Sequence, residues 1–180
     1  METITLGAGC FWCVEAIFKS LKGIVSVKPG YCGGTIEKPT YEQVYTGTTG
    51  HAEVCQVVYD ENIISFEEIL EVYFKTHDPT SLNQQGDEDI GTQYRSVIFY
   101  HSEKQRSTAV SIIKMLNNEE VYTNPVVTEI TPIENFYEAE AYHHNYLELN
   151  PENQYCQRVV IPKIEKFKAV FRNKLKGVSE

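Results

Sequence analysis

The first twenty residues switch from one hydrophobic period to another, and that switch limits the folds open to this chain. Residues 2–8 alternate between apolar and polar side chains, which is the period of a half-buried β-strand. After them, Val14, Ile17, Phe18 and Leu21 recur at the spacing that places side chains on one face of a helix. Because the two patterns follow each other within a few residues, the chain begins with a strand that leads directly into a helix.

Strand and helix patterns alternate along the rest of the chain as well. The strand patterns are residues 24–31, residues 53–60, the run YRSVIFY and the run VVTEI. Two helix starts carry capping boxes, which are Ser65 with Glu68 and Ser102 with Gln105, and the second helix is expected to run to about Asn117. Near the end of the chain, the Lys-rich run KIEKFKAVFRNKLK predicts an amphipathic helix on the surface.

This order of elements predicts an α+β fold. We expect a two-layer sandwich in which helices cover a small mixed β-sheet with a ferredoxin-like βαβ core. Two long loops, residues 32–52 and 77–93, and a C-terminal tail complete it, and loops of this length often carry function. A chain of 180 residues is long enough for one sizeable core and too short for two. We therefore expect a single domain over residues 1–180, with a distinct segment from about residue 150.

Composition and charge argue against several classes of partner. The formal net charge of -9 disfavours a nucleic acid, whose phosphates attract clustered Lys and Arg. No segment approaches a membrane span, and Met1 is followed by a strand-like run instead of a secretory signal. Five cysteines, an odd number, do not suit a disulfide framework and favour a reducing compartment. We expect a soluble, monomeric, cytoplasmic protein.

The stretch GAGCFWC places two cysteines around two bulky aromatics at the switch from strand to helix. Cys10 falls in the first turn of the expected helix, and no Ser, Thr, Asp or Asn precedes it to cap the free amides. A thiolate at such a position gains from those amides and from the helix dipole, so we expect a lowered pKa and a nucleophilic Cys10. Cys32 and Cys55 lie in strand patterns and are expected to be plain core residues.

Three interpretations of this stretch compete on the residues alone. A zinc site would join Cys10 and Cys13 to His51 and Cys55, but the second pair lies across a strand pattern, which disfavours it. A thioredoxin-like dithiol oxidoreductase fits a CxxC motif that follows a strand and opens a helix. In the third interpretation Phe11 and Trp12 are simple core aromatics and the cysteines are inert. Spacing alone does not decide among them.

Several further motifs, in order along the chain, resemble those of the A-type peptide methionine sulfoxide reductases. They are GCFWC, GY.GG, PTYEQV, TGHAEV, HDPTSLNQQG, GTQYRS and NP...YC. The resemblance covers about residues 4 to 165. It implies reduction of methionine S-sulfoxide, free or in peptides and proteins, with no metal or organic cofactor and with thioredoxin as the reductant. The thioredoxin-like dithiol oxidoreductase remains the alternative.

The resemblance also implies a role for each residue of the first motif. Cys10 corresponds to the nucleophile that attacks the sulfoxide sulfur, which would leave a sulfenic acid on Cys10. Phe11 and Trp12 correspond to the residues that wall an apolar pocket for the substrate methyl group, a contact that soft sulfur chemistry favours.

The oxygen of the sulfoxide needs an acid, because it leaves poorly until it is protonated. By resemblance Glu53 is that acid, and burial against aromatics is expected to raise its pKa. Tyr41 and Tyr94 correspond to tyrosines that direct hydroxyl groups at the same oxygen. The run QGDEDIG holds one residue more than the family usually has, so the acid of this loop is Asp89, which we prefer, or Asp87.

A second thiol must remove the sulfenic acid as a disulfide before the enzyme can act again. Two candidates for this resolving role exist. Cys13 lies one helical turn after Cys10, and Cys156 lies in what resembles the mobile C-terminal segment of the family; we expect Cys156 to be the more accessible of the two. A departure in YEAEAYHHNY, where Ala141 and His144 replace the more usual Asp and Gln, leaves that segment without an assigned role.

Overall fold

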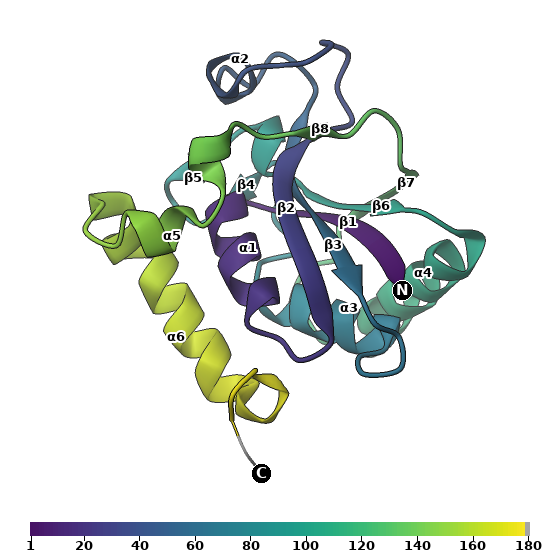
Figure 1. Cartoon of the computed structure of the whole chain (residues 1–180). Helices are drawn as coiled ribbons and strands as arrows, with labels where there is room; N and C mark the ends of the chain where they lie inside the picture. Colours follow the sequence, from purple (N-terminus) through teal and green to yellow (C-terminus); the bar gives the residue numbers. More distant parts are fainter. Residues whose placement is uncertain (179–180) are drawn as a thin grey trace.

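A computed structural model describes residues 1–178 and has at its centre a six-stranded mixed sheet (Figure 1). The strands are β1 (Glu2–Ala8), β2 (Ile24–Cys32), β3 (Ala52–Tyr59), β6 (Ser96–Tyr100), β7 (Glu129–Pro132) and β8 (Tyr137–Glu138). Their order across the sheet is β7-β6-β1-β3-β2-β8. Within the described residues, β6 and β7 pair in parallel and the other neighbouring strands of this sheet are antiparallel.

The middle of this sheet has the ferredoxin-like topology that the sequence predicts. Strand β1, helix α1 (Phe11–Lys19) and strand β2 are followed by β3, helix α3 (Phe66–Lys75) and β6. In space β6, β1, β3 and β2 lie side by side with antiparallel neighbours, so the fourth, first, third and second core strands are adjacent in that order. The prediction of an α+β fold with a small mixed sheet is confirmed.

The remaining helices are α2 (Tyr41–Tyr45), α4 (Glu103–Asn118), α5 (Tyr146–Leu149) and α6 (Ile161–Val170), and α6 continues a π-helical turn, η3 (Cys156–Val160). The capping box of Ser65 and Glu68 forms as expected at the start of α3. At α4 only half of the expected box forms, because the Gln105 side chain accepts from the His101 amide instead of the Ser102 amide. The expected loops contain α2 and a small hairpin, β4 (Gln84–Gln85) with β5 (Asp89–Ile90).

The alternation of β3 decides which of its side chains reach the helices. Glu53 and Cys55 point to the face covered by α1, where Glu53 Oε1 accepts a hydrogen bond from the Phe11 amide and the Cys55 thiol donates to the Phe11 carbonyl. Val54 points to the opposite face and joins a small second core, against which Phe136 packs. A carboxyl on strand β3 is thereby aimed at the first turn of α1.

The C-terminal helix differs from the surface helix expected over residues 163–176. It begins earlier, with the π-helical turn that carries Cys156, and it ends at Val170. Ile164 and Phe167 are buried, so one side of α6 belongs to the core (Figure 1). This side packs near α1, and the segment from about residue 150 is thus tied to the first helix.

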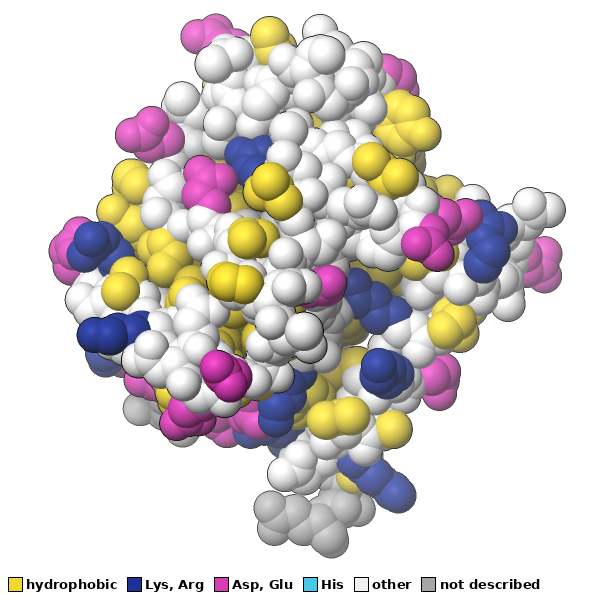
Figure 2. Space-filling model, turned by 180° about the vertical axis from the view of Figure 1, so that it is seen from behind, with side chains coloured by type: hydrophobic (Ala, Val, Ile, Leu, Met, Phe, Trp, Pro, Cys, Tyr) yellow, Lys and Arg dark blue, Asp and Glu magenta, His cyan; other side chains and the backbone are white. Residues whose placement is uncertain are grey.

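The surface carries charges of both signs. On the face seen in Figure 2, acidic and basic side chains are interspersed with small apolar areas, so neither sign forms a continuous field there. Within residues 1–178 the structure contains no helix of the length and apolarity needed to cross a membrane.

We predict that Gly9→Ala destabilises the protein more than Gly86→Ala, although both glycines have positive φ angles, +86° and +65°. A Cβ at Gly9 would lie 2.9 Å from Cγ of Gln85, whose amide is held by both backbone groups of Asp78. At Gly86 no atom of the described chain lies within 4 Å. The φ cost alone is about 1 kcal/mol, whereas Gly9→Ala should cost roughly 2–4 kcal/mol. Equal losses in urea unfolding would contradict the steric argument.

Candidate active site

A cavity of about 370 Å³ opens where the β1–α1 turn, β3, α2, the 84–94 loop and the C-terminal segment meet. Its lining residues are Cys10, Trp12, Tyr41, Tyr45, Glu53, Glu88, Asp89, Tyr94, Asn153 and Tyr155. Six of the residues singled out from the sequence are therefore brought together. Phe11 is not among the lining residues, because its ring is fully buried and packs against Tyr31 and His143 beneath the cavity.

Cys10 is the N-cap residue of α1, and no side chain caps that end of the helix. It follows Gly9, whose positive φ turns the chain from β1 into the helix. The expected lowering of its pKa is wrong. Burial raises the pKa of Cys10 well above its ordinary value, and interaction with the Cys13 thiol and the charge of Glu53 add to the rise. The free amide of Phe11, on which the prediction relied, is used by Glu53 at 3.2 Å.

Glu53 lies beside Cys10 on strand β3 and is 2% exposed. Burial raises its pKa to about 8, the hydrogen bond from the Phe11 amide opposes that rise, and the charge of Asp89 adds to it. The direction agrees with the expectation from the sequence. At neutral pH the carboxyl is protonated, so it has a proton to give to a group in the cavity.

Two tyrosine hydroxyls face the same cavity. Burial, together with the charge of Glu53, raises the pKa of both Tyr41 and Tyr94, which keeps each hydroxyl protonated as a hydrogen-bond donor. Tyr41 starts helix α2, and its amide donates to Glu140 Oε2 at 3.0 Å. Tyr94 lies in the short 3-10 turn that precedes β6. The two donors therefore come from separate elements and line the same cavity as Glu53.

Asp89, and not Asp87, reaches the cavity. Asp89 is 8% exposed and accepts a hydrogen bond from the Tyr155 hydroxyl at 2.7 Å, whereas Asp87 is exposed. Burial raises the pKa of Asp89, and the Tyr155 hydroxyl opposes that rise. The extra residue of this loop is accommodated on the surface, where Glu88 forms an ion pair with Arg158 of η3 at 2.6 Å.

Both candidate resolving thiols are buried. Cys13 is 1% exposed and Cys156 is 0% exposed, so the expected accessibility of Cys156 is wrong for this conformation. The reason is that η3 packs into the core, with Val160 also buried. Cys13 interacts directly with Cys10, which lowers the pKa of Cys13, and Cys13 also lies close enough to Cys156 to raise the pKa of that thiol.

The zinc interpretation finds no geometry to support it. Both ring nitrogens of His51 are engaged within its own loop, Nδ1 by the Gly34 amide and Nε2 by the Ile36 carbonyl. No group of three or more His, Cys, Asp or Glu side chains in residues 1–178 is arranged to hold a metal ion.

Sequence reasoning missed several residues of the site. Tyr155 directly precedes Cys156 in the motif NP...YC, and that position was a usable signal. Glu140 lies in the segment to which no role was assigned. Its carboxylate accepts hydrogen bonds from the Tyr41 amide and, at 2.8 Å, from the Tyr31 hydroxyl. These contacts join residues about a hundred positions apart, and nothing local in the sequence indicates them.

The cavity brings together a cysteine thiol, a protonated carboxyl and two tyrosine hydroxyls, an arrangement suited to cysteine chemistry that needs a proton donor. The model of the family described as "Peptide methionine sulfoxide reductase" matches residues 2–175. The chain belongs to the peptide methionine sulfoxide reductase family, and it is an oxidoreductase of that class. The resemblance noted from the motifs is confirmed, and the thioredoxin-like alternative is not favoured.

Two curated relatives cover nearly the whole chain. "Peptide methionine sulfoxide reductase MsrA" of Saccharolobus solfataricus is 54% identical over 98% of this chain and 98% of its own length. The protein of the same name from Sulfolobus acidocaldarius is 52% identical over 97% of each chain.

Solved structures of Mxr1 from Saccharomyces cerevisiae share the fold. The reduced form has a TM-score of 0.79 at 39% identity and covers 86% of this chain and 88% of its own. An unusual oxidised form scores 0.63 at 38% identity, with coverage of 84% and 82%. The complex with Trx2 scores 0.57 at 30% identity, with coverage of 81% and 84%. Because these are states of one protein, the present structure is more similar to its reduced conformation.

We predict that Glu53→Gln removes part of the pH dependence of stability. The folded pKa of about 8 lies above the ordinary 4.5, so the stability tied to this proton is complete below about pH 4.5 and is lost as the pH rises through about 8. Gln stays neutral throughout. The free energy of unfolding of the variant minus that of the parent should therefore increase by a few kcal/mol from about pH 5 to about pH 9. A difference that is the same at every pH would show that Glu53 does not titrate in this way.

Proposed function

We propose that this chain repairs methionine S-sulfoxide, free or in peptides and proteins, with Cys10 as nucleophile and thioredoxin as the final reductant. The observation that carries the assignment of roles is the buried, protonated Glu53 beside Cys10 in the cavity. A sulfoxide that enters this cavity meets a sulfur nucleophile and a proton donor at once.

In the first half-reaction the Cys10 sulfur attacks the sulfoxide sulfur while Glu53 gives its proton to the oxygen. The new S–S bond and the S–O bond of the substrate then break as the oxygen passes to Cys10, so the sulfoxide is reduced to a thioether and Cys10 is oxidised to a sulfenic acid. The proton that Cys10 loses replaces the one that Glu53 gave, so the carboxyl is restored. The raised pKa of free Cys10 means that its proton leaves only as the substrate accepts charge, with Tyr41 and Tyr94 donating hydrogen bonds to the oxygen.

Aromatic side chains supply the apolar part of the site. The Trp12 indole is stacked on Tyr146, with ring centroids 3.7 Å apart, and meets the edge of Tyr155 at 5.8 Å. Its exposed part lines the cavity and offers a flat surface to the substrate methyl group. Asp89 of β5, which accepts a hydrogen bond from the Tyr155 hydroxyl, adds a polar group to the lining of the cavity.

The second half-reaction returns Cys10 to its thiol. The Cys13 thiol gives up its proton and attacks the sulfenic sulfur, the departing hydroxyl takes up that proton and leaves as water, and a Cys10–Cys13 disulfide forms; the direct interaction of these thiols supports this order. Cys156 then attacks Cys13 and frees Cys10, and thioredoxin supplies two electrons to the remaining disulfide. Cys156 also attacks the Cys10 sulfenic sulfur directly where Cys13 is absent, so Cys13 is not essential for this passage. The complex of the yeast relative with Trx2 supports thioredoxin as this partner.

We place the enzyme in the cytoplasm as a monomer. Its five cysteines are all free thiols, as a reducing compartment keeps them, and the mechanism needs a cytosolic dithiol reductant.

We predict that the enzyme reduces the S epimer of a methionine sulfoxide peptide with dithiothreitol and leaves the R epimer and insulin disulfides unreacted. Cys10→Ser should abolish the reaction, because no adjacent base ionises a serine there. Glu53→Gln should lower the rate constant roughly a hundredfold or more through loss of the general acid. Reduction of insulin without reduction of either epimer would refute the proposed function, and an unchanged rate in Glu53→Gln would refute the role of the acid.

We predict that Cys156 limits turnover with thioredoxin more than Cys13 does. Release of one methionine per enzyme should survive in both Cys13→Ser and Cys156→Ser, because that step needs Cys10 alone. Turnover with thioredoxin should fall sharply in Cys156→Ser, whereas dithiothreitol, a small reductant, should still drive this variant. Peptide mapping after one turnover checks the bridges. If only a Cys10–Cys13 bridge forms and Cys156→Ser cycles normally with thioredoxin, Cys156 has no resolving role.

A further inference from the structure

His143 lies beneath the active-site cavity and is completely buried. Its Nδ1 accepts a hydrogen bond of 3.0 Å from Nε1 of Trp12, the sole tryptophan of the chain. Its Nε2 is also buried and has no hydrogen-bond partner within residues 1–178. Most buried polar atoms have a hydrogen-bond partner, so a free buried Nε2 is uncommon. The bond to Trp12 is therefore the one that anchors the His143 ring within the described residues.

The bond to Trp12 determines the chemical form of the imidazole. An indole N–H only donates, so Nδ1 must be the acceptor and the ring must be the neutral tautomer with its proton on Nε2. Burial lowers the pKa of His143, which keeps the ring in this neutral form. His143 is therefore a fixed acceptor that holds the indole of Trp12 by its one polar atom.

The same imidazole contacts both kinds of side chain that line the cavity. Its ring centroid lies 5.9 Å from that of Trp12, on the apolar wall, and 4.5 Å from that of Tyr41, which carries a hydroxyl donor. It also lies 4.9 Å from the buried ring of Phe11. A change in the His143 ring is thus transmitted first to the wall that the substrate methyl group would touch.

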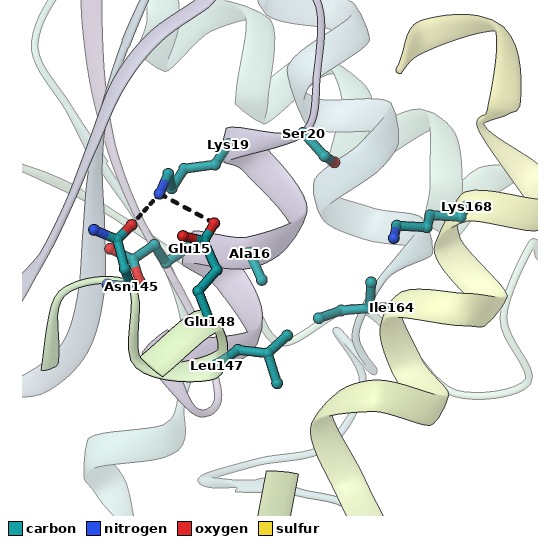
Figure 3. Close-up of a pocket in the computed structure, with 9 residues that line it drawn as sticks. All are labelled: Glu15, Ala16, Lys19, Ser20, Asn145, Leu147, Glu148, Ile164 and Lys168. Atoms are coloured by element: carbon teal, nitrogen blue, oxygen red, sulfur yellow. Dashed lines mark hydrogen bonds and ion pairs between the residues drawn. The ribbon is translucent and has the colours of Figure 1, made fainter. Parts of the chain in front are cut away.

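The backbone around His143 is fastened on two sides. The next turn of chain is held to α1, where Glu15 accepts from the Asn145 amide at 2.8 Å and Lys19 contacts Asn145 and Glu148 (Figure 3). On the other side, Glu140 holds the first residue of α2. His143 itself belongs to the short 3-10 turn between these anchors, so its position does not depend on the indole that it binds.

We propose that His143 is a positioning residue that fixes the Trp12 indole and thereby gives the site its preference for a methyl group on the sulfoxide sulfur. The proposal rests on the proposed function, since it concerns recognition of that substrate. An indole held at both its face, by Tyr146, and its N–H, by His143, cannot shift to admit a larger group. Loss of the acceptor leaves only the stacking contact, which permits sliding.

The test compares methionine sulfoxide with ethionine sulfoxide, which has one additional methylene on the sulfur. His143→Phe keeps an aromatic ring and removes the acceptor, and His143→Asn restores an acceptor oxygen near the place of Nδ1. We expect the ratio of kcat/KM for the two substrates to fall roughly tenfold in His143→Phe and to stay within about threefold of the parent in His143→Asn. His144→Phe, the same change at the next residue, should leave the ratio unchanged.

Two further measurements separate positioning from a general structural effect. In a Trp12→Phe background, His143→Phe should change the ratio no further, because the group that it positions is absent. Fluorescence of Trp12 reports its environment directly, and its emission should shift in His143→Phe and not in His143→Asn. If His143→Phe does not fold, His143→Gln replaces it, since the amide of Gln lies nearer the place of Nε2 and offers Trp12 no acceptor.

The outcomes test the positioning role of His143 separately from the proposed reduction of sulfoxides. A folded His143→Phe or His143→Gln with the parent ratio and the parent emission overturns it. So does an equal fall in the ratio in His143→Asn or in His144→Phe. If the parent protein reduces no sulfoxide at all, the proposed function fails, and with it the claim about methyl preference, whereas the fluorescence comparison still decides whether His143 positions Trp12.

Discussion

The hydrogen bond from the Phe11 amide to Glu53 joins the first turn of α1 to strand β3, and the chemistry of the site depends on it. A helix N-terminus stabilises one nearby negative charge. Two acids, the Cys10 thiol and the Glu53 carboxyl, compete for that stabilisation, and both are buried. Desolvation exceeds what one amide returns, so the pKa of each is raised and both hold their protons. Before substrate binds, Cys10 is consequently a thiol and Glu53 a neutral carboxylic acid, and the site holds no preformed thiolate.

This state suits a substrate whose oxygen must be protonated before it leaves. A preformed thiolate would also react with other oxidants, whereas a thiol paired with a neutral acid becomes nucleophilic only as the proton moves. The two thiols differ in their surroundings. Asp89 adds to the raised pKa of Cys10 and Glu53, whereas interaction with Cys10 and, to a smaller extent, the positive charge of Lys163 on α6 lower the pKa of Cys13. The second thiol is thus the more easily ionised, which is what a thiol that attacks a sulfenic acid needs.

The sequence predicted those features that depend on local pattern. The alternation of β3 places Glu53 on the face toward the helices, and the capping box of Ser65 and Glu68 forms where it was expected. Prediction from the sequence failed for features that depend on how distant parts of the chain pack together. The rule for a cysteine at a helix N-terminus counts free amides and not burial, so it gave the wrong direction for the pKa of Cys10. The bond from Trp12 to His143 spans 131 residues, and no local pattern reports it.

The proposed mechanism requires Cys156 to leave its buried position, and the contacts of the C-terminal segment determine what that movement costs. Cys156 is buried in a π-helical turn, a rare form that is frequent at functional sites. Two side-chain contacts hold this turn to the 84–94 loop, one between Tyr155 and Asp89 and one between Arg158 and Glu88. The second is a surface ion pair, and such pairs contribute about 1 kcal/mol or less. The surface pair therefore costs little to break, whereas the core packing of Cys156 and Val160 and the Tyr155–Asp89 bond hold the segment more firmly. Under the proposed mechanism, a change of charge at Cys10 would act directly on Asp89, the carboxyl that accepts the hydrogen bond of Tyr155 next to Cys156.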